Sequence, residues 1–208
     1  MINSVLALGF DNTEINWSDL TPISIEHKKT GSTADFDISL EANDSLVGLY
    51  ATSDIVLASG LIGCFLGIDA ASLLGKYKAG EDQQWVKDVS ALRDLLVLAR
   101  AIRSDTQEVI TKTLGSSAFE LFTALEGFAQ KSIRTILVGP GAIALGFVAM
   151  RSNSKLKDSL FVVNAPTVPA INEAVKFIGC KEIVATKENL HPLAELALAV
   201  TTLKASEI

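Results

Sequence analysis

Glycines and residues with amide, hydroxyl or cationic side chains occur in three turns. Each turn lies between a short apolar run and a helical pattern. These turns hold Gly139, Pro140, Gly141, Asn164, Thr167, Lys187, Glu188, Asn189 and His191. Backbone N–H groups at a helix start attract anions, and polar side chains beside them orient a ligand. We therefore expect a small anionic ligand here, bound by Gly139, Gly141, Asn164, Thr167 and Lys187.

The first of these turns has two interpretations. Gly139-Pro-Gly141 follows a strand pattern and precedes a helical one, as a phosphate cradle would. It matches neither the P-loop nor the dinucleotide fingerprint, and Pro140 lacks one backbone donor. A plain tight turn is the ordinary alternative.

His191 is the catalytic candidate, because it precedes the last helical segment on the same predicted edge. A histidine at a helix start favours its neutral form, which suits acid/base chemistry. The sequence supplies no partner carboxylate beside it, so a polar turn residue is the simpler interpretation. Cofactors and reaction type stay unknown.

Three strand–turn–helix units must position these residues. The runs 134–138, 160–163 and 182–185 are short and apolar, and each is followed by a turn and a helical pattern. Such alternation predicts a C-terminal parallel βαβαβα unit over residues 132–208. Right-handed crossovers then place all three turns on one edge, where open α/β sheets bind ligands. Thr167 is the expected N-cap of the second helix.

The turn at 139–141 followed by the segment 164–170 resembles the closing segment of uroporphyrinogen-III synthases. This chain departs from that pattern in the strand and helix that follow.

The middle of the chain, residues 52–131, is predicted to be mostly helical. Trp85, Val89, Leu92, Leu96 and Ala99 recur at helical spacing, which indicates an amphipathic helix. Either Ser53 or Asp54 is a candidate cap for a helix beginning near Ile55, although two short buried strands also fit residues 46–68. The stretch 76–84 is polar and contains Gly80, and it is the nearest feature in the sequence to a boundary between sub-regions.

The N-terminal segment, residues 1–51, is predicted to be β-rich. Alternation over 23–27 and 36–40 suggests an antiparallel hairpin, with further strands at 4–8 and 46–50. The class is thus mixed α/β, and we expect residues 1–208 to form a single domain. Whether the N-terminal strands join the C-terminal sheet is left open.

Composition excludes several classes of function. The net charge is −6 and no basic cluster occurs, which argues against nucleic-acid binding and a basic membrane-surface helix. The longest apolar run, 55–68, is too short for a membrane span, and a signal peptide pattern is absent, so we expect a cytoplasmic protein.

Cys64 and Cys180 are too far apart for a CxxC motif, and with two histidines a transition-metal site is not expected. The ordinary interpretation is two reduced, buried thiols.

Two functional hypotheses follow. The first is an α/β domain that binds a small anionic ligand, with or without catalysis, and acts as a homo-oligomer. The second is a non-catalytic, self-assembling structural subunit of a larger complex, shell or filament. The charged fraction of 20% and the hydrophobic fraction of 49% motivate both oligomeric predictions, because part of such a surface tends to be covered.

Overall fold

A computed structural model describes residues 4–10, 24–28, 45–163, 165–180, 182–183 and 190–206. Within them, five strands form one sheet in the order β2-β1-β3-β4-β5. The strands are β1 (Ser4–Leu8), β2 (Ser24–Lys28), β3 (Ser45–Tyr50), β4 (Arg134–Val138) and β5 (Leu160–Val163). Every one of these pairs is parallel. The mixed α/β class is confirmed.

The pairing corrects the prediction for the N-terminal segment. Both β2 and β3 pair with β1 in parallel, so these described strands are not antiparallel. The predicted partner strand at 36–40 lies outside the described residues. β3 also pairs with β4, which joins the front and back of the chain in one sheet. Period-two alternation indicates a half-buried strand, but it does not indicate whether that strand pairs in parallel or antiparallel.

The third predicted strand of the C-terminal unit lies partly outside the described residues. A parallel bridge links Val162 to Glu182, and the Ile183 N–H donates to the Val162 carbonyl at 2.9 Å.

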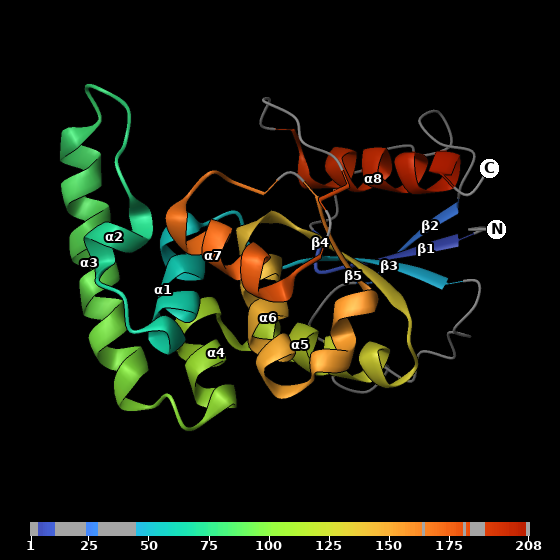
Figure 1. The fold of residues 1–208 in the computed structure, drawn as a ribbon, viewed down its shortest axis with the longest axis horizontal. Coiled ribbons are helices and arrows are strands. Elements are labelled where there is room, and N and C mark those ends of the chain that lie inside the picture. Colours follow the sequence, from blue (N-terminus) through green and yellow to red (C-terminus); the bar gives the residue numbers. More distant parts are fainter. Residues whose placement is uncertain are drawn as a thin grey trace.

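Helices cover both faces of the sheet unequally (Figure 1). They are α1 (Ile55–Leu66), α2 (Ala70–Leu74), α3 (Asp82–Ala101), α4 (Thr106–Leu114), α5 (Ser116–Gln130), α6 (Gly139–Ser152), the 3-10 helix η2 (Ser154–Asp158), α7 (Pro169–Ile178) and α8 (Pro192–Ser206). α8 packs on one face, whereas α1, α5, α6 and α7 contribute to the core on the other.

Alternate residues of the strands feed these two cores. In β1, Leu6 and Leu8 face the larger core, and Val5 and Ala7 face α8. Every one of these side chains is at most 5% exposed. α8 approaches β3 so closely that a Cβ at Gly48 would lie 2.4 Å from a Leu196 methyl group. A sheet covered on both faces explains why its strands are nearly all apolar.

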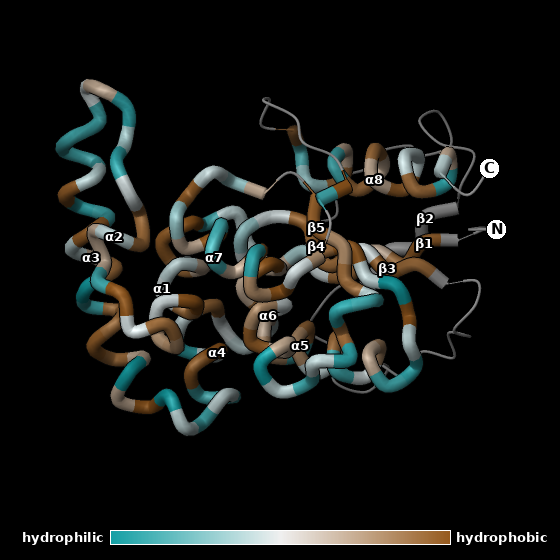
Figure 2. Tube along the Cα trace, viewed as in Figure 1, coloured by the Kyte–Doolittle hydropathy of each residue, from teal (hydrophilic) through white to brown (hydrophobic). Residues whose placement is uncertain are grey.

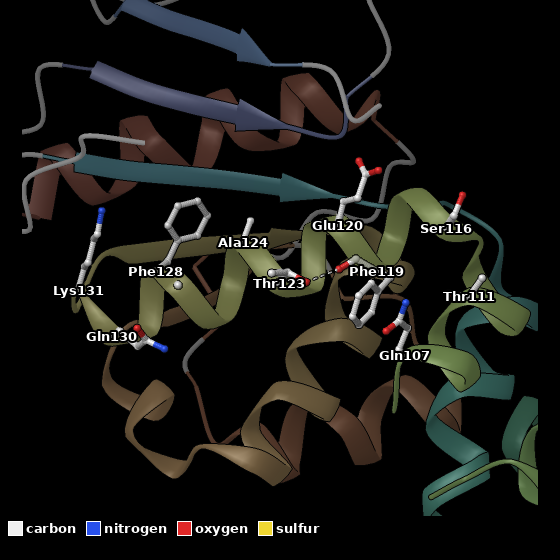
Figure 3. A pocket seen from close by; sticks show the side chains of 11 residues that line it. Gln107, Thr111, Ser116, Phe119, Glu120, Thr123, Ala124, Phe128, Gln130 and Lys131 are labelled. Atoms are coloured by element: carbon white, nitrogen blue, oxygen red, sulfur yellow. Dashed lines mark hydrogen bonds between the residues drawn. The ribbon is translucent and has the colours of Figure 1, made fainter. Parts of the chain in front are cut away.

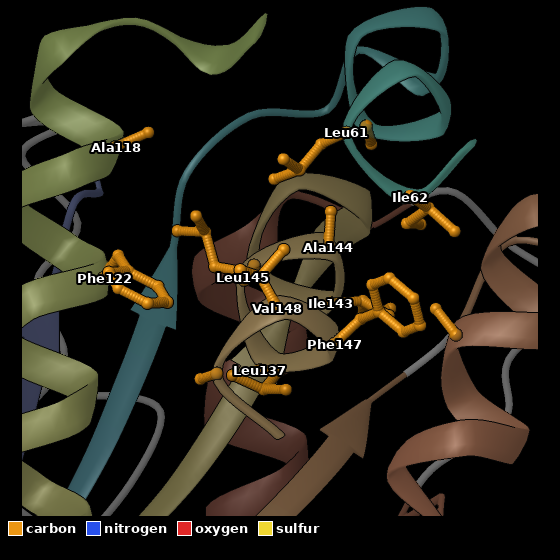
Figure 4. Packing of buried hydrophobic residues seen from close by; sticks show 14 of the residues in the cluster. Leu61, Ile62, Ala118, Phe122, Leu137, Ile143, Ala144, Leu145, Phe147 and Val148 are labelled. Carbon is orange, nitrogen blue, oxygen red and sulfur yellow. The ribbon is translucent and has the colours of Figure 1, made fainter. Parts of the chain in front are cut away.

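α6 lies at the centre of the larger core (Figure 4). All residues from Pro140 to Met150 are buried. Figure 4 shows Phe147 and Leu145 on different sides of this helix, with Leu61 of α1 and Phe122 of α5 nearby. A helix that is apolar around its whole circumference is one surrounded by other elements.

The uncertain segment 46–68 is a strand followed by a helix. The Asp54 carboxylate accepts from the Val56 and Leu57 N–H groups at 2.8 and 3.0 Å, which confirms it as the cap of α1. Gly63 lets α1 approach its neighbours, because a Cβ there would lie 2.3 Å from a Leu73 methyl group. The predicted buried face of α3 is confirmed, and residues 52–131 are mostly helical as expected.

Among the described residues, no helix is both long and apolar enough to cross a membrane.

Phe147 and Phe177 offer a matched test of the core. Their rings meet edge to face at 5.1 Å, yet Phe147 is 0% exposed and Phe177 is 47% exposed. We expect Phe147→Ala to lower the free energy of unfolding by about 3–5 kcal/mol, because it leaves a cavity. Phe177→Ala, the control, should cost about 1 kcal/mol, the contribution of an aromatic pair. Equal losses in urea denaturation would contradict this packing.

Candidate functional site: the carboxyl edge of the sheet

The strand order reverses between β1 and β3, and open parallel sheets bind ligands beyond the carboxyl ends of the strands at such a switch point. The residues that follow β1 and β3 here are Gly9, Phe10 and Ala51. The Phe10 and Tyr50 rings stack at 5.5 Å. Gly9 has φ of 81°, and a Cβ there would lie 2.0 Å from the Tyr50 carbonyl oxygen. The two strand ends are therefore held in close contact.

A cavity of about 660 Å³ runs along α5 and reaches this end of the sheet (Figure 3). Its described lining includes the apolar residues Phe119, Ala124 and Phe128 and the polar residues Glu120, Thr123 and Lys131. Leu121, next to Glu120, lies 3.0 Å from the Cβ position of Gly9. Figure 3 shows Glu120 directed toward the arrowhead ends of the neighbouring strands.

Glu120 was not a sequence-based site candidate. It is half-buried and lines the cavity, and only the three-dimensional structure brings it to the end of β1. The position of Glu120 in the chain fits an ordinary helix cap. The sequence alone therefore does not distinguish a capping role from a place in the cavity wall.

The turn at 139–141 packs against the end of β3. The Gly141 N–H donates to the Thr52 carbonyl at 3.1 Å. Gly139 has φ of 77°, and a Cβ there would lie 3.1 Å from the Tyr50 ring. The structure thus brings the predicted turn against Tyr50 and Thr52, although the Gly141 donor is already bonded within the protein. Its role in ligand binding stays a prediction.

The three helix starts at this edge differ in electrostatics. The Asp54 carboxylate occupies the start of α1. α6 and α7 have neither an acidic residue in the first turn nor a side-chain cap among the described residues. Because a helix start carries partial positive charge, those two starts are where an anion would be stabilised.

Thr167 lies near the start of α7, but it is not the predicted N-cap. Val168 holds that position, with an extended backbone, and Pro169 is the first helical residue. The proline fixes the start of the helix one residue later than the cap pattern suggests. The Thr167 side chain is exposed beside this start.

The segment between α2 and α3, whose sequence indicates only a polar connection, also reaches the site. A Cβ at Gly75 would lie 2.9 Å from the Pro169 ring. The Gly75 carbonyl accepts from the Trp85 indole N–H at 2.7 Å. The Tyr77 hydroxyl donates to Asp88 at 2.8 Å. These bonds fix the segment on α3 and bring the exposed Lys76 close to α7.

Two ligand-binding candidates, Asn164 and Lys187, lie outside the described residues. His191 is exposed, and its Nδ1 accepts from the Leu193 N–H at 3.3 Å. The catalytic candidate thus caps the start of α8. The Glu182 carboxylate accepts from the Ala165 N–H at 2.8 Å, so one negative charge lies next to the turn after β5.

Local hydrogen bonds engage Thr52 and Asp54 at this edge, and the two cysteines lie elsewhere in the chain. The Thr52 hydroxyl accepts from the Asp54 N–H at 3.1 Å, and Asp54 caps α1, so both are engaged in local structure. The two cysteines are free thiols, and burial raises the pKa of both, that of Cys180 to about 11. Protonated thiols are poor nucleophiles. In the described part of the chain, no group of His, Cys, Asp and Glu is arranged to hold a metal ion.

Gly141→Ala tests the contact between the two turns. The added Cβ would lie 2.8 Å from the Thr52 backbone nitrogen, so we expect a loss of roughly 1–3 kcal/mol in unfolding free energy. Gly127→Ala is the control, because no atom lies within 4 Å of its Cβ position and alanine favours helix by up to about 1 kcal/mol. Equal melting temperatures for the two variants would contradict the close approach.

Tyr77 provides a test of the segment over α7. Burial, and then the hydrogen bond to Asp88, raise the pKa of Tyr77 to about 12. The unfolded value is about 10, so this contribution to stability is fully present below pH 10 and is lost as pH rises toward 12. Phenolate absorbance of the wild type minus Tyr77→Phe should therefore titrate near pH 12. A midpoint near pH 10 would show that Tyr77 is neither buried nor bonded to Asp88 in solution.

Comparison with known proteins gives the fold. No family model matches the chain, and no curated protein matches its sequence. Two solved structures from Thermus thermophilus are similar: a nicotinate-nucleotide-dimethylbenzimidazole phosphoribosyltransferase and a protein described as CobT. Their TM-scores are 0.64 and 0.63, each at 12% sequence identity over 99% of this chain and 82% of theirs. At this identity the likeness establishes a shared α/β fold.

Proposed function

We propose that this chain binds a small anionic ligand of the phosphorylated nucleotide or sugar class at the carboxyl edge of its sheet. The observation that carries the proposal is the pair of helix starts, α6 and α7, that no described side chain caps. Asn164 and Thr167 orient the ligand by hydrogen bonds, and Lys187 with the helix starts holds its anionic group. Gly139 and Gly141 form the turn against which it lies.

Charge at this edge is distributed in a way that supports such a ligand. Lys76 is exposed close to the start of α7, and Asp54 excludes a second anion from α1. At the other end of the edge, Glu120 adds a carboxylate to a cavity wall that also holds Thr123, Gln130 and Lys131. A molecule with an anionic group and a hydrogen-bond-donating ring fits both ends. A nucleotide has this form, and one of the similar structures is a nicotinate-nucleotide-dimethylbenzimidazole phosphoribosyltransferase.

The protein is proposed to act as a homo-oligomer, and a cytoplasmic location stays a prediction. The second candidate function is a non-catalytic, self-assembling structural subunit. In the described part of the chain, three of the five exposed large hydrophobic side chains lie on α3, which favours an assembly role for that helix.

Ligand binding can be tested with inorganic phosphate, ribose 5-phosphate, nicotinate mononucleotide and AMP. We expect at least one phosphorylated compound to raise the melting temperature, because binding to the folded state stabilises it. Lys187→Ala and Asn164→Ala should each weaken its affinity by about tenfold or more, since a hydrogen bond to a charged group contributes roughly 1.5–3 kcal/mol.

Lys155→Ala is the matched control, because Lys155 is exposed in η2, which precedes β5 at the opposite edge of the sheet. It should leave the affinity unchanged. If Asn164→Ala and Lys187→Ala bind the same compound as tightly as the wild type, the edge is not the binding site. Turnover of the bound compound, measured as release of phosphate or of the base, would identify the protein as an enzyme.

A further inference from the structure

The outer face of α3 carries apolar side chains that nothing in the described chain covers. Val86, Val97 and Leu98 are 59%, 67% and 64% exposed. The opposite face, including Val89, Leu92 and Leu96, is buried against the rest of the molecule. α3 lies at the rim of the molecule, far from the chain termini, and hydrophobic positions recur along it (Figures 1 and 2). Helices with an apolar stripe on both faces commonly use the second one for association.

Lys87 and Asp94, two charges near the centre of this outer face, have no charged partner on their own helix. Lys87 and Asp94 are exposed and seven positions apart, so they lie on one stripe but too far apart to pair. The residues three and four positions away from either of them are Gln83, Gln84, Ser90, Ala91, Val97 and Leu98, none of which is charged. Within the described residues, the recorded ion pair is Lys176–Glu173, and neither Lys87 nor Asp94 takes part in one.

We infer that α3 is a two-fold interface with a second copy of this chain, in which the two α3 helices pack antiparallel. A two-fold interface is self-complementary, so if Lys87 faces Asp94 of the second copy, Asp94 faces Lys87 of that copy. Both ion pairs therefore form in the same register. The inference does not depend on the proposed ligand.

This register places small residues at the symmetry axis. The midpoint between Lys87 and Asp94 falls between Ser90 and Ala91, both exposed. Small side chains there let the two helix backbones come close together. Val86 lies on the N-terminal side of the axis and Val97 with Leu98 on the C-terminal side, so both halves of the contact bury apolar surface.

The length of α3 and the chemistry of its outer face fit a dimer of moderate affinity. α3 has 20 residues and is about 30 Å long. A contact made mainly by one helix pair is at the small end of specific interfaces, so we expect dissociation in the micromolar range. The two flanking charges fix the register and exclude a parallel arrangement, which would place like charges together.

The test is the mass in solution, measured by analytical ultracentrifugation over the micromolar range. The wild type should approach twice 22.1 kDa. Lys87→Glu places a second carboxylate opposite Asp94, and Asp94→Lys places a second ammonium group opposite Lys87. Each variant alone should dimerise at least about tenfold more weakly, because each dimer then holds two like-charge contacts.

Mixing the two variants separates a lost interface from a damaged fold. In a mixed dimer, one copy carries two carboxylates at these positions and the other carries two ammonium groups, so both contacts again join opposite charges. The mixture, and likewise the double variant Lys87→Glu/Asp94→Lys, should regain wild-type dimerisation. Failure of both to regain it would overturn the register.

The apolar part of the interface has its own control. Val97→Asp should abolish dimerisation, whereas Leu198→Asp, on α8 at a side chain 42% exposed, should not change it. Circular dichroism confirms that each variant remains folded. A wild type that is still monomeric at about 200 μM, well above the expected dissociation range, would overturn the inference. So would an oligomer that none of the α3 substitutions weakens.

Discussion

The burial of α6 is the constraint on which the rest of the structure depends. This helix is apolar on every side, so the sheet must cover one side and α1, α5 and α7 the others. Its start is consequently fixed against the end of β3, where Gly139 and Gly141 leave no room for a side chain. A backbone donor there bonds to the Thr52 carbonyl, which ties the turn after β4 to the turn after β3. The geometry of the carboxyl edge thus follows from core packing.

Packing at that edge leaves an uneven distribution of charge. α1 begins with its own carboxylate cap, and its partial positive charge is already compensated by Asp54. α6 and α7 begin with a valine at the cap position and a proline in the first turn, neither of which can supply a side-chain acceptor. Glu182 and Glu120 bring negative charge to the flanks of the edge. If the proposed ligand binds here, its anionic group faces the starts of α6 and α7, and its hydrogen-bond donor faces Glu120.

Local patterns in the sequence predicted elements well and their partners poorly. Apolar runs ended by glycine or proline located β4 and β5, and the spacing of Trp85, Val89 and Leu92 located α3, because these signals depend only on neighbouring residues. The direction of pairing depends on which strand lies alongside, so period-two alternation could not predict that β2 pairs with β1 in parallel. Thr167 has the right residue type for a cap, but Pro169 determines where α7 starts. The roles of Gly75 and Glu120 rest on contacts between residues far apart in the chain, which spacing cannot encode.

The segment between α2 and α3 links the two surfaces for which functions are proposed. Trp85 lies on α3 and bonds to Gly75, and Gly75 touches Pro169 at the start of α7. A second copy packed on α3 would restrict the motion of that helix and so hold Gly75 in place. Ligand at the start of α7 would in turn hold Pro169 against Gly75. Since coupling between two binding events is reciprocal, any gain in ligand affinity on dimerisation must equal the gain in dimer affinity on ligand binding. The connection from Trp85 to Pro169 is short: the Trp85 indole N–H donates to the Gly75 carbonyl, and Gly75 lies against the Pro169 ring.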